Sequence, residues 1–86
     1  MKQFEKRLKA VANRRRLTII KFLKETGGAS VGDISREIRM SFRTTSKHLG
    51  VLSATDIIDK EQRGRRVLYF LSKYQEPVIK SILSFL

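Results

Sequence analysis

The sequence of 86 residues contains no cysteine and no tryptophan, and only one proline and one histidine. Without cysteine the chain can form neither a disulfide bond nor a thiolate metal site. The absence also fits a reducing compartment, and we expect a cytoplasmic location. So short a chain has to hold one small core together without a covalent cross-link, and association with a second subunit is one way to do so.

Long apolar runs are also missing. No stretch approaches the roughly 18 consecutive apolar residues that a membrane-spanning helix needs, and the N-terminus lacks the apolar region of a signal peptide. Acid–base pairs, a nucleophile beside an oriented base and glycine-rich phosphate loops are absent as patterns. The sequence therefore predicts a protein that is not an enzyme, binds no metal or other cofactor and does not associate with a membrane.

Acidic residues are scarce, because 8 Asp and Glu stand against 19 Lys and Arg and leave a net charge of +11. Such an excess repels itself unless a polyanion neutralises it, and nucleic acid is the commonest polyanion. Apolar residues make up 41% of the chain, which is enough for a packed fold and too many for a disordered basic tail. The composition indicates one folded domain over residues 1–86 with an anionic partner.

Apolar residues at helical spacing predict three helices before residue 40. The first, from Lys2 to Ala12, is basic and amphipathic. Asn13 is a good N-cap for the second, which the glycine pair at 27–28 would end. A short third helix follows a capping-box pattern that begins at Ser30.

A fourth helix is expected from Ser41 to Leu52, after a tight turn at Arg39 and Met40. Ser41 is its N-cap. A short helix, a turn and a second helix with a polar outer face predict a helix-turn-helix. At 100° per residue, the outer face carries Arg43, Ser46, Lys47 and Gly50, and the inner face carries Phe42, Thr45, His48, Leu49 and Leu52.

The outer face has the donors that base recognition uses. Arg43 can form two hydrogen bonds with guanine, and base or phosphate contacts are predicted for Thr44, Ser46 and Lys47. We interpret Phe42 as a packing or staple residue rather than a reader of a thymine methyl group. His48 is interpreted as a satisfied residue of the inner flank rather than a phosphate contact or a pH switch. Gly50 would let a backbone approach closely, or it is merely tolerated.

Two strands are predicted next, from Ile57 to Gln62 and from Arg66 to Leu71. Gly64 between them permits the positive φ of a hairpin turn. Arginines surround this turn, and three more occupy the first turn of the second helix, where the helix dipole disfavours cations. These arginines either extend into water or meet phosphate. The predicted backbone contacts are Arg14, Arg15, Arg16, Ser41, Arg63, Arg65 and Arg66.

Pro77 suits the first turn of a final helix. This helix has more apolar surface than so small a domain can easily cover. Together with the first helix it could form a dimer interface made of Phe4, Leu8, Val78, Ile79, Ile82, Leu83 and Leu86. Binding to a membrane surface is the weaker alternative, because the polar side offers only Lys80, Ser81 and Ser84.

Several segments resemble the ArsR-type winged-helix repressors, in the expected order between Leu8 and Leu71. Residues 8–17 are similar to the family's Leu-x-Ala-Leu-Ala-Asn opening and its Arg-Leu pair, and residues 30–34 are similar to the start of the helix before the turn. Residues 41–52, with Ser-Lys-His-Leu at 46–49, resemble the recognition helix. Residues 63–69 resemble the wing.

The resemblance implies a winged helix-turn-helix in the order α-α-α-α-β-β-α. It also implies a homodimer, joined through its first and last helices, that binds double-stranded DNA. Many members are repressors released by metal ions, but this chain has no cysteine, its only histidine lies in the recognition helix, and its last helix offers Glu76 without a histidine. Metal sensing is therefore not expected.

Arg39 and Asp56 stand where the family usually has glycine. A left-handed backbone at Arg39 would cost about 1 to 2 kcal/mol, so the turn geometry is open there.

The leading hypothesis is a sequence-specific regulator of transcription, namely a dimeric repressor of a palindromic double-stranded DNA operator. Helix 41–52 would read the major groove and the wing at 63–66 would contact the backbone. One alternative is an architectural or RNA-binding winged-helix protein without sequence preference. Another is a protein-interaction module that docks through its apolar tail.

Overall fold

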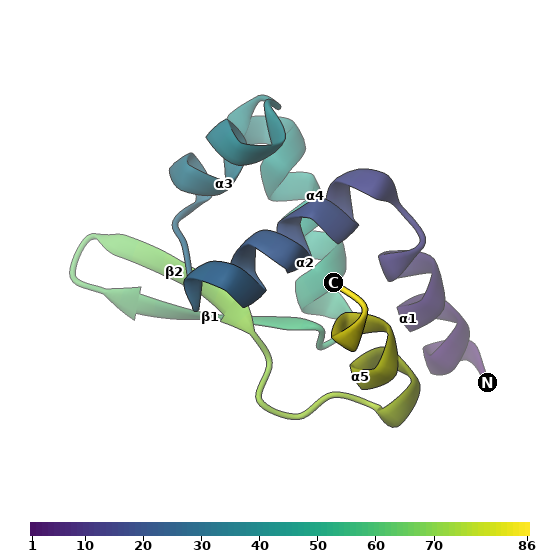
Figure 1. Cartoon of the computed structure of the whole chain (residues 1–86). Coiled ribbons are helices and arrows are strands. Elements are labelled where there is room, and N and C mark those ends of the chain that lie inside the picture. Colours follow the sequence, from purple (N-terminus) through teal and green to yellow (C-terminus); the bar gives the residue numbers. More distant parts are fainter.

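A computed structural model describes all residues from 1 to 86. Five helices and one antiparallel hairpin follow each other as α1 (Lys2–Val11), α2 (Arg14–Thr26), α3 (Val31–Ile38), α4 (Phe42–Ala54), β1 (Ile58–Arg63), β2 (Arg66–Leu71) and α5 (Pro77–Ser84). The hairpin projects from the helical body, and α1 lies at the opposite end of the molecule (Figure 1). The predicted order and the winged helix-turn-helix architecture are confirmed. None of the five helices has the length and apolar character needed to cross a membrane.

The helices begin and end where local capping chemistry places their boundaries. The side chain of Asn13 accepts a hydrogen bond from the N–H of Arg16 at 3.1 Å and starts α2. Gly27 ends this helix with a left-handed φ of +79°. The hydroxyl of Ser30 accepts from the N–H of Asp33 at 3.2 Å and starts α3. The caps predicted from the sequence are therefore the ones that the structure uses.

The hairpin pairs in a regular antiparallel register from Ile58 opposite Leu71 to Arg63 opposite Arg66. The bounds of β2 match the prediction, whereas β1 begins and ends one residue later than predicted. One pairing was not predicted: Ala29 and Tyr69 exchange two backbone hydrogen bonds of 2.9 and 2.8 Å. These bonds fix the connection between α2 and α3 against the base of the wing.

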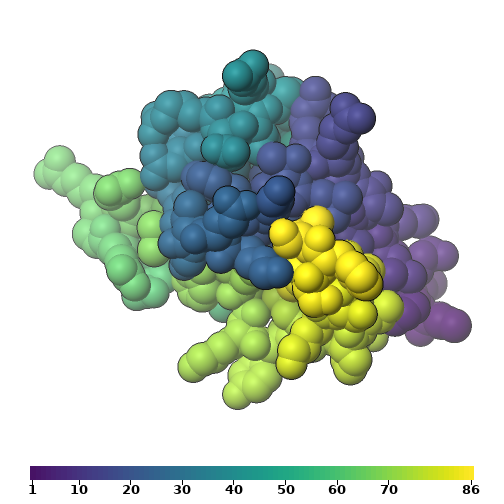
Figure 2. Space-filling model, in the orientation of Figure 1, coloured from purple at the N-terminus to yellow at the C-terminus, as the bar shows by residue number.

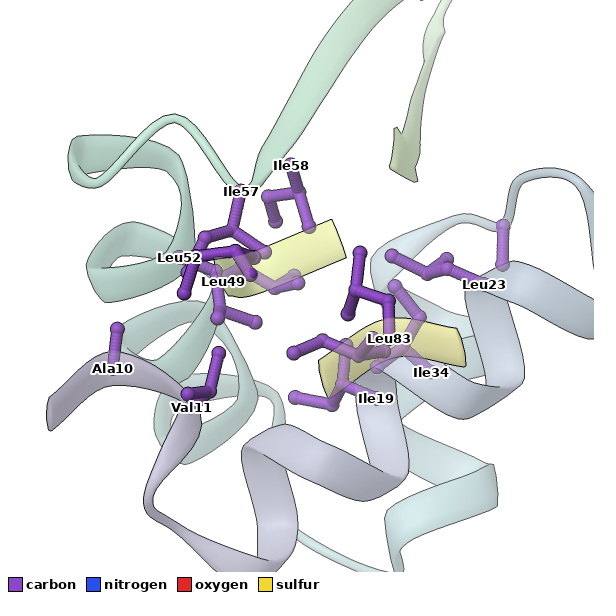
Figure 3. Packing of buried hydrophobic residues seen from close by; sticks show 13 residues of the cluster. Ala10, Val11, Ile19, Leu23, Ile34, Leu49, Leu52, Ile57, Ile58 and Leu83 are labelled. Atoms are coloured by element: carbon purple, nitrogen blue, oxygen red, sulfur yellow. The ribbon is translucent and has the colours of Figure 1, made fainter. Parts of the chain in front are cut away.

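The core collects apolar side chains from every helix and from the start of β1. In Figure 3, Leu49 and Leu52 of α4 lie beside Ile57 and Ile58, while Leu83 of α5 faces the side chains of α2 and α3. The buried apolar residues are Ala10, Val11, Ile19, Ile20, Leu23, Ala29, Ile34, Leu49, Leu52, Ile57, Ile58, Ile79 and Leu83. Since α4 buries one face in this core, its opposite face is turned outward.

Helix α5 corrects part of the predicted dimer interface. Ile79 and Leu83 are only 1% and 7% exposed, because they pack into the core of their own protomer and cannot offer a surface to a second copy. Lys24 also donates to the carbonyl of Leu83 at 3.0 Å, and α5 lies against α2 in the space-filling view (Figure 2). The other predicted residues, namely Phe4, Leu8, Val78, Ile82 and Leu86, are half-buried and keep an outward surface.

Candidate nucleic-acid interface

The start of α4 is fixed by Ser41. Its hydroxyl accepts from the N–H of Thr44 at 3.1 Å and donates to the hydroxyl of Thr44 at 3.0 Å. Thr45, Leu49 and Leu52 are the buried residues of this helix, as the helical spacing predicts. The rotation of α4 about its own axis is thereby set by a cap at one end and by the core along its length.

The outward face of α4 carries cations without partners. Arg43, Ser46, Lys47 and Gly50 are exposed. Neither Arg43 nor Lys47 forms an ion pair or a side-chain hydrogen bond within the chain. Thr44 differs from the other three residues predicted to contact bases, because it is half-buried and its hydroxyl already accepts a hydrogen bond from the N-cap Ser41. The face thus offers free guanidinium, ammonium and hydroxyl donors to a partner.

The turn before α4 has a left-handed backbone at Arg39, the residue whose turn geometry the sequence leaves open. Arg39 has φ 54° and ψ 46°, and its N–H donates to the carbonyl of Ser35. The N–H of Met40 reaches the same carbonyl at 3.2 Å. Asp56, for which the resemblance to the family also implies a glycine position, has a positive φ of 59° as well. The helix-turn-helix therefore keeps its geometry although a bulky side chain stands at the hinge.

The three arginines at the start of α2 have different surroundings. Arg16 donates from Nε to the carbonyl of Ala10 at 2.6 Å and from Nη2 to that of Lys9 at 3.2 Å. A cation at the end of α1 satisfies free carbonyls and complements the negative end of the helix dipole. Arg16 thus joins helices, a role that the sequence did not reveal. Arg14 and Arg15 are exposed.

The charges around His48 show which of these arginines is near α4. The pKa of His48 is lowered first by burial, then by the positive charge of Arg16, and then by Arg15 and Lys47. Arg15 and Arg16 thus lie close enough to α4 for their charges to act on His48. Arg14 instead borders a hollow between α2 and the C-terminal Leu86. His48 is half-buried, in agreement with its predicted place on the inner flank.

The arginines of the wing also differ in their partners. Gly64 makes the turn with a φ of +62°. Arg63 lies 3.5 Å from the carboxylate of Glu61, and Arg66 lies 3.8 Å from that of Asp33 in α3. Arg65 has no such partner. The turn of the wing thus presents one unpaired guanidinium, that of Arg65, while the ion pair of Arg66 with Asp33 links the tip end of the wing to α3.

Asp33 serves two elements at once. Hydrogen bonding to Ser30 and then the positive charge of Arg36 lower its pKa. Arg36 also donates to this carboxylate. This ionised carboxylate faces Arg66 with an opposite charge and partly neutralises it.

Phe42 corrects a prediction. It was interpreted as a packing or staple residue, but its exposed fraction is 66%. As the first residue after the cap, it leaves the helix where no other element covers it. The signal that could have shown this is its position directly after Ser41, since the inner face of a helix cannot be inferred reliably from its first turn.

No group of three or more His, Cys, Asp or Glu residues that could hold a metal ion occurs in the structure.

Comparisons with known proteins agree with this geometry. The family model described as "Bacterial regulatory protein, arsR family" matches residues 13–60, from the cap of α2 into β1. The chain belongs to the ArsR family. The family assignment therefore rests on the helix-turn-helix itself, and it confirms the resemblance inferred from the sequence.

Two curated relatives of this ArsR-family chain are named as regulators of transcription. The HTH-type transcriptional regulator YgaV of Escherichia coli is 34% identical over 62 residues, which are 72% of this chain and 63% of YgaV. The transcriptional activator HlyU of Vibrio cholerae is 32% identical over 76 residues, which are 88% of this chain and 69% of HlyU. The chain thus spans less than two thirds of the length of YgaV. Neither name describes an enzyme.

Solved structures of the family superpose on most of this chain. The structure of HlyU has a TM-score of 0.81 at 29% identity and covers 96% of this chain and 86% of HlyU. The homodimeric winged helix-turn-helix DNA-binding domain of Mb0332 from Mycobacterium bovis has a TM-score of 0.83 at 25% identity, with 98% of this chain and 74% of that domain covered. This chain has the winged-helix DNA-binding fold of the ArsR family of bacterial regulatory proteins.

Proposed function

We propose that the protein is a dimeric regulator that binds double-stranded DNA sequence-specifically, without catalysis. The observation that carries this proposal is the exposed face of α4, where Arg43 and Lys47 have no partner. Charged side chains gain most when they meet an opposite charge, and the net charge of +11 favours a polyanion. A helix whose rotation is fixed by a cap and by the core can present the same donors to every operator.

Each predicted contact has a role that follows from its surroundings. Arg43 is suited to guanine, with Ser46 and Lys47 next along the exposed face. Thr44 is better placed to support the cap than to read a base. Among the predicted phosphate contacts, Arg15 and Arg65 are foremost, because neither has a partner within the chain and the charge of Arg15 acts on His48 of α4. Arg14 also lacks a partner but borders the hollow beside Leu86, and it remains a secondary phosphate contact together with Ser41, Arg63 and Arg66. Arg16 is already committed to the end of α1.

A second copy of the chain would complete the operator contact. Helices α1 and α5 lie away from the tip of the wing (Figure 1). A dimer formed through their half-buried apolar residues would leave both wings free, together with the exposed Arg43 and Lys47 of both α4 helices. The Mb0332 domain is described as homodimeric, which supports a dimer for this chain as well. Two α4 helices would enter successive major grooves of a palindrome whose half-sites are centred about 34 to 36 Å apart.

Repression is the outcome that we propose for this binding. Occupation of a promoter by a dimer is sufficient to block transcription, whereas activation requires a further contact or a change in the DNA. The name of HlyU shows that a relative activates, so a reporter gene downstream of the operator has to decide the direction. A regulator acts in the compartment that holds its DNA, and we therefore propose a cytoplasmic location.

The test begins with selection of preferred duplexes from a random pool by the purified protein, followed by titrations of the selected duplex at several salt concentrations. We expect a defined palindrome and a steep loss of affinity with salt. Arg43→Ala should relax the selected sequence, because each specific base pair contributes about 1 to 3 kcal/mol of discrimination. Arg65→Ala should weaken binding to all sequences alike.

Lys73→Ala is the matched control. Lys73 is exposed in the connection between β2 and α5, outside α4 and the wing, so removal of its charge should change affinity little. Equal affinity for unrelated duplexes would contradict sequence-specific binding and favour the architectural alternative. An affinity that does not change between low and moderate salt would contradict DNA binding altogether.

A further inference from the structure

Phe42 is an exposed aromatic residue at the end of α4 that would enter the major groove first. The other large apolar side chains with high exposure are Met1, Val51, Tyr74 and Phe85. Three of these four belong to the chain ends or to the connection before α5. A single exposed apolar residue is common on protein surfaces, so exposure alone decides nothing. Phe42 differs from the other exposed apolar residues because residues proposed to contact DNA lie next to it.

Phe42 borders a hollow of about 270 Å³ between the beginning of α3, the beginning of α4 and the wing. Val31 and Val67 contribute apolar surface to this hollow, and Arg65 and Arg66 contribute cations. The phenyl ring therefore stands between two sets of proposed DNA contacts, with Arg43 next to it in α4. In helix-turn-helix proteins the N-terminal residues of the recognition helix contact the base edges.

The chemistry of a phenyl ring limits what it can read there. Phenylalanine has no hydrogen-bond donor or acceptor, so it cannot distinguish the polar edges of bases. The apolar group that the four ordinary bases present in the major groove is the C5-methyl of thymine, and contact with an apolar side chain is the way it is read. Removal of both groups from water stabilises the contact.

We propose that Phe42 is a specificity-determining residue that contacts the C5-methyl of a thymine in each half-site, close to the base that Arg43 reads. This inference rests on the proposed binding of double-stranded DNA. It reverses the interpretation drawn from the sequence, since the structure leaves Phe42 largely uncovered. Operators of this protein then carry a conserved A·T pair beside the position read by Arg43.

The test replaces each thymine of the selected palindrome in turn by deoxyuridine, which removes the methyl group and leaves every hydrogen-bonding group unchanged. For the unmodified protein, one symmetric pair of positions should weaken binding about fourfold per half-site, the loss expected for one buried methyl group. Phe42→Ala should bind the thymine and deoxyuridine duplexes at those positions equally. Phe42→Leu should keep part of the discrimination because it keeps an apolar contact.

Tyr74→Ala is the matched control, since Tyr74 is an aromatic residue with 90% exposure that lies outside α4 and the wing. It should discriminate thymine from deoxyuridine as the unmodified protein does. Circular dichroism melting of each variant separates lost folding from lost contact. If no single duplex is selected, both this inference and the proposed function fail. If a palindrome is selected but no thymine methyl contributes to binding, or if Phe42→Ala keeps the discrimination, only the role of Phe42 is overturned.

Discussion

The guanidinium of Arg16 in α2 lies 3.2 Å from Nδ1 of His48 in α4, while two other nitrogens of the same group bind the last carbonyls of α1. One side chain thereby joins the helix proposed for DNA reading to two helices behind it. Arginine can only donate hydrogen bonds, so Nδ1 of His48 accepts and the neutral ring carries its proton on Nε2. A protonated ring would lose this bond and face Arg16 with a like charge.

The stability of the protein should therefore fall as the solution becomes mildly acidic. Burial, followed by the charges of Arg16, Arg15 and Lys47, lowers the pKa of His48 in the folded state. The unfolded chain then binds a proton at a higher pH than the folded chain, so the free energy of unfolding is greatest above about pH 6.5 and declines as pH falls towards the folded pKa. Urea unfolding at pH 7.5 and pH 5 measures this decline.

His48→Gln is the control for this prediction, because glutamine can accept the bond from Arg16 and does not titrate. The variant should lose less stability than the unmodified protein between the two pH values. Asp33, whose pKa is lowered, stays ionised across this range and does not contribute to the difference. An equal decline in both proteins would show that another group is responsible.

Arg39→Gly should stabilise the fold. The left-handed backbone of Arg39, with φ 54°, is unfavourable for a residue with a Cβ atom and is accessible to glycine at little cost. The expected gain in the free energy of unfolding is about 1 kcal/mol, reduced by the greater freedom of glycine in the unfolded chain. Arg39→Ala removes the same charge but retains the strained backbone, so it should give no gain. A comparable gain in both variants would attribute the effect to charge.

Thr45→Val should also stabilise the protein. Thr45 is fully buried near the start of α4, and its hydroxyl has no hydrogen-bond partner. Valine has nearly the same shape without the polar group, so the free energy of unfolding should rise by roughly 1 kcal/mol. Because the side chain lies on the inner face, affinity for DNA should not change. Thr45→Ser, which keeps the hydroxyl and removes a methyl group, should be destabilising; a stable Ser variant would indicate a bond to the hydroxyl in solution.

Features that depend only on residues close together in the sequence follow from its pattern. The caps at Asn13, Ser30 and Ser41 involve residues three positions apart, and the hairpin follows from one alternating segment around Gly64, so the pattern alone predicts them. The positions that failed depend on what other elements cover. Phe42 was expected to pack and is exposed, whereas Ile79 was expected at an interface and is buried.

The same distinction explains the candidate site. The outward position of Arg43 and Lys47 follows from helical periodicity in α4 and was predicted. The commitment of Arg16 depends on the end of α1 lying beside α4, a tertiary relationship that charge patterning does not contain. The pairing of Arg66 with Asp33 is likewise set by the position of the wing against α3.

Gly50→Ala tests how closely DNA approaches the recognition helix. A Cβ atom at Gly50 would meet nothing within 4 Å, and alanine favours a helix interior over glycine by about 1 kcal/mol, so the variant should be more stable by that amount. If a DNA backbone passes over Gly50, the added methyl group should nevertheless weaken binding. Unfolding and DNA titration of the same variant separate the two effects. A stabilised variant with unchanged affinity would show that Gly50 is merely tolerated.

Ile82→Asp tests the proposed dimer at a residue outside the fully buried core. Ile82 packs against the core with part of its surface, while the neighbouring Leu83 anchors α5. A charge at position 82 should oppose association, and circular dichroism melting of the variant checks that the protomer stays folded. Sedimentation velocity should show a dimer for the unmodified protein and a monomer for the variant. Since two linked half-sites raise affinity by making the second contact intramolecular, the monomer should bind a palindrome no more tightly than a single half-site.

Ser84→Asp introduces the same charge at an exposed position of α5 and serves as the control. A variant that remains dimeric would place the interface elsewhere, and an unmodified protein that is monomeric at operator-binding concentrations would contradict the dimer itself.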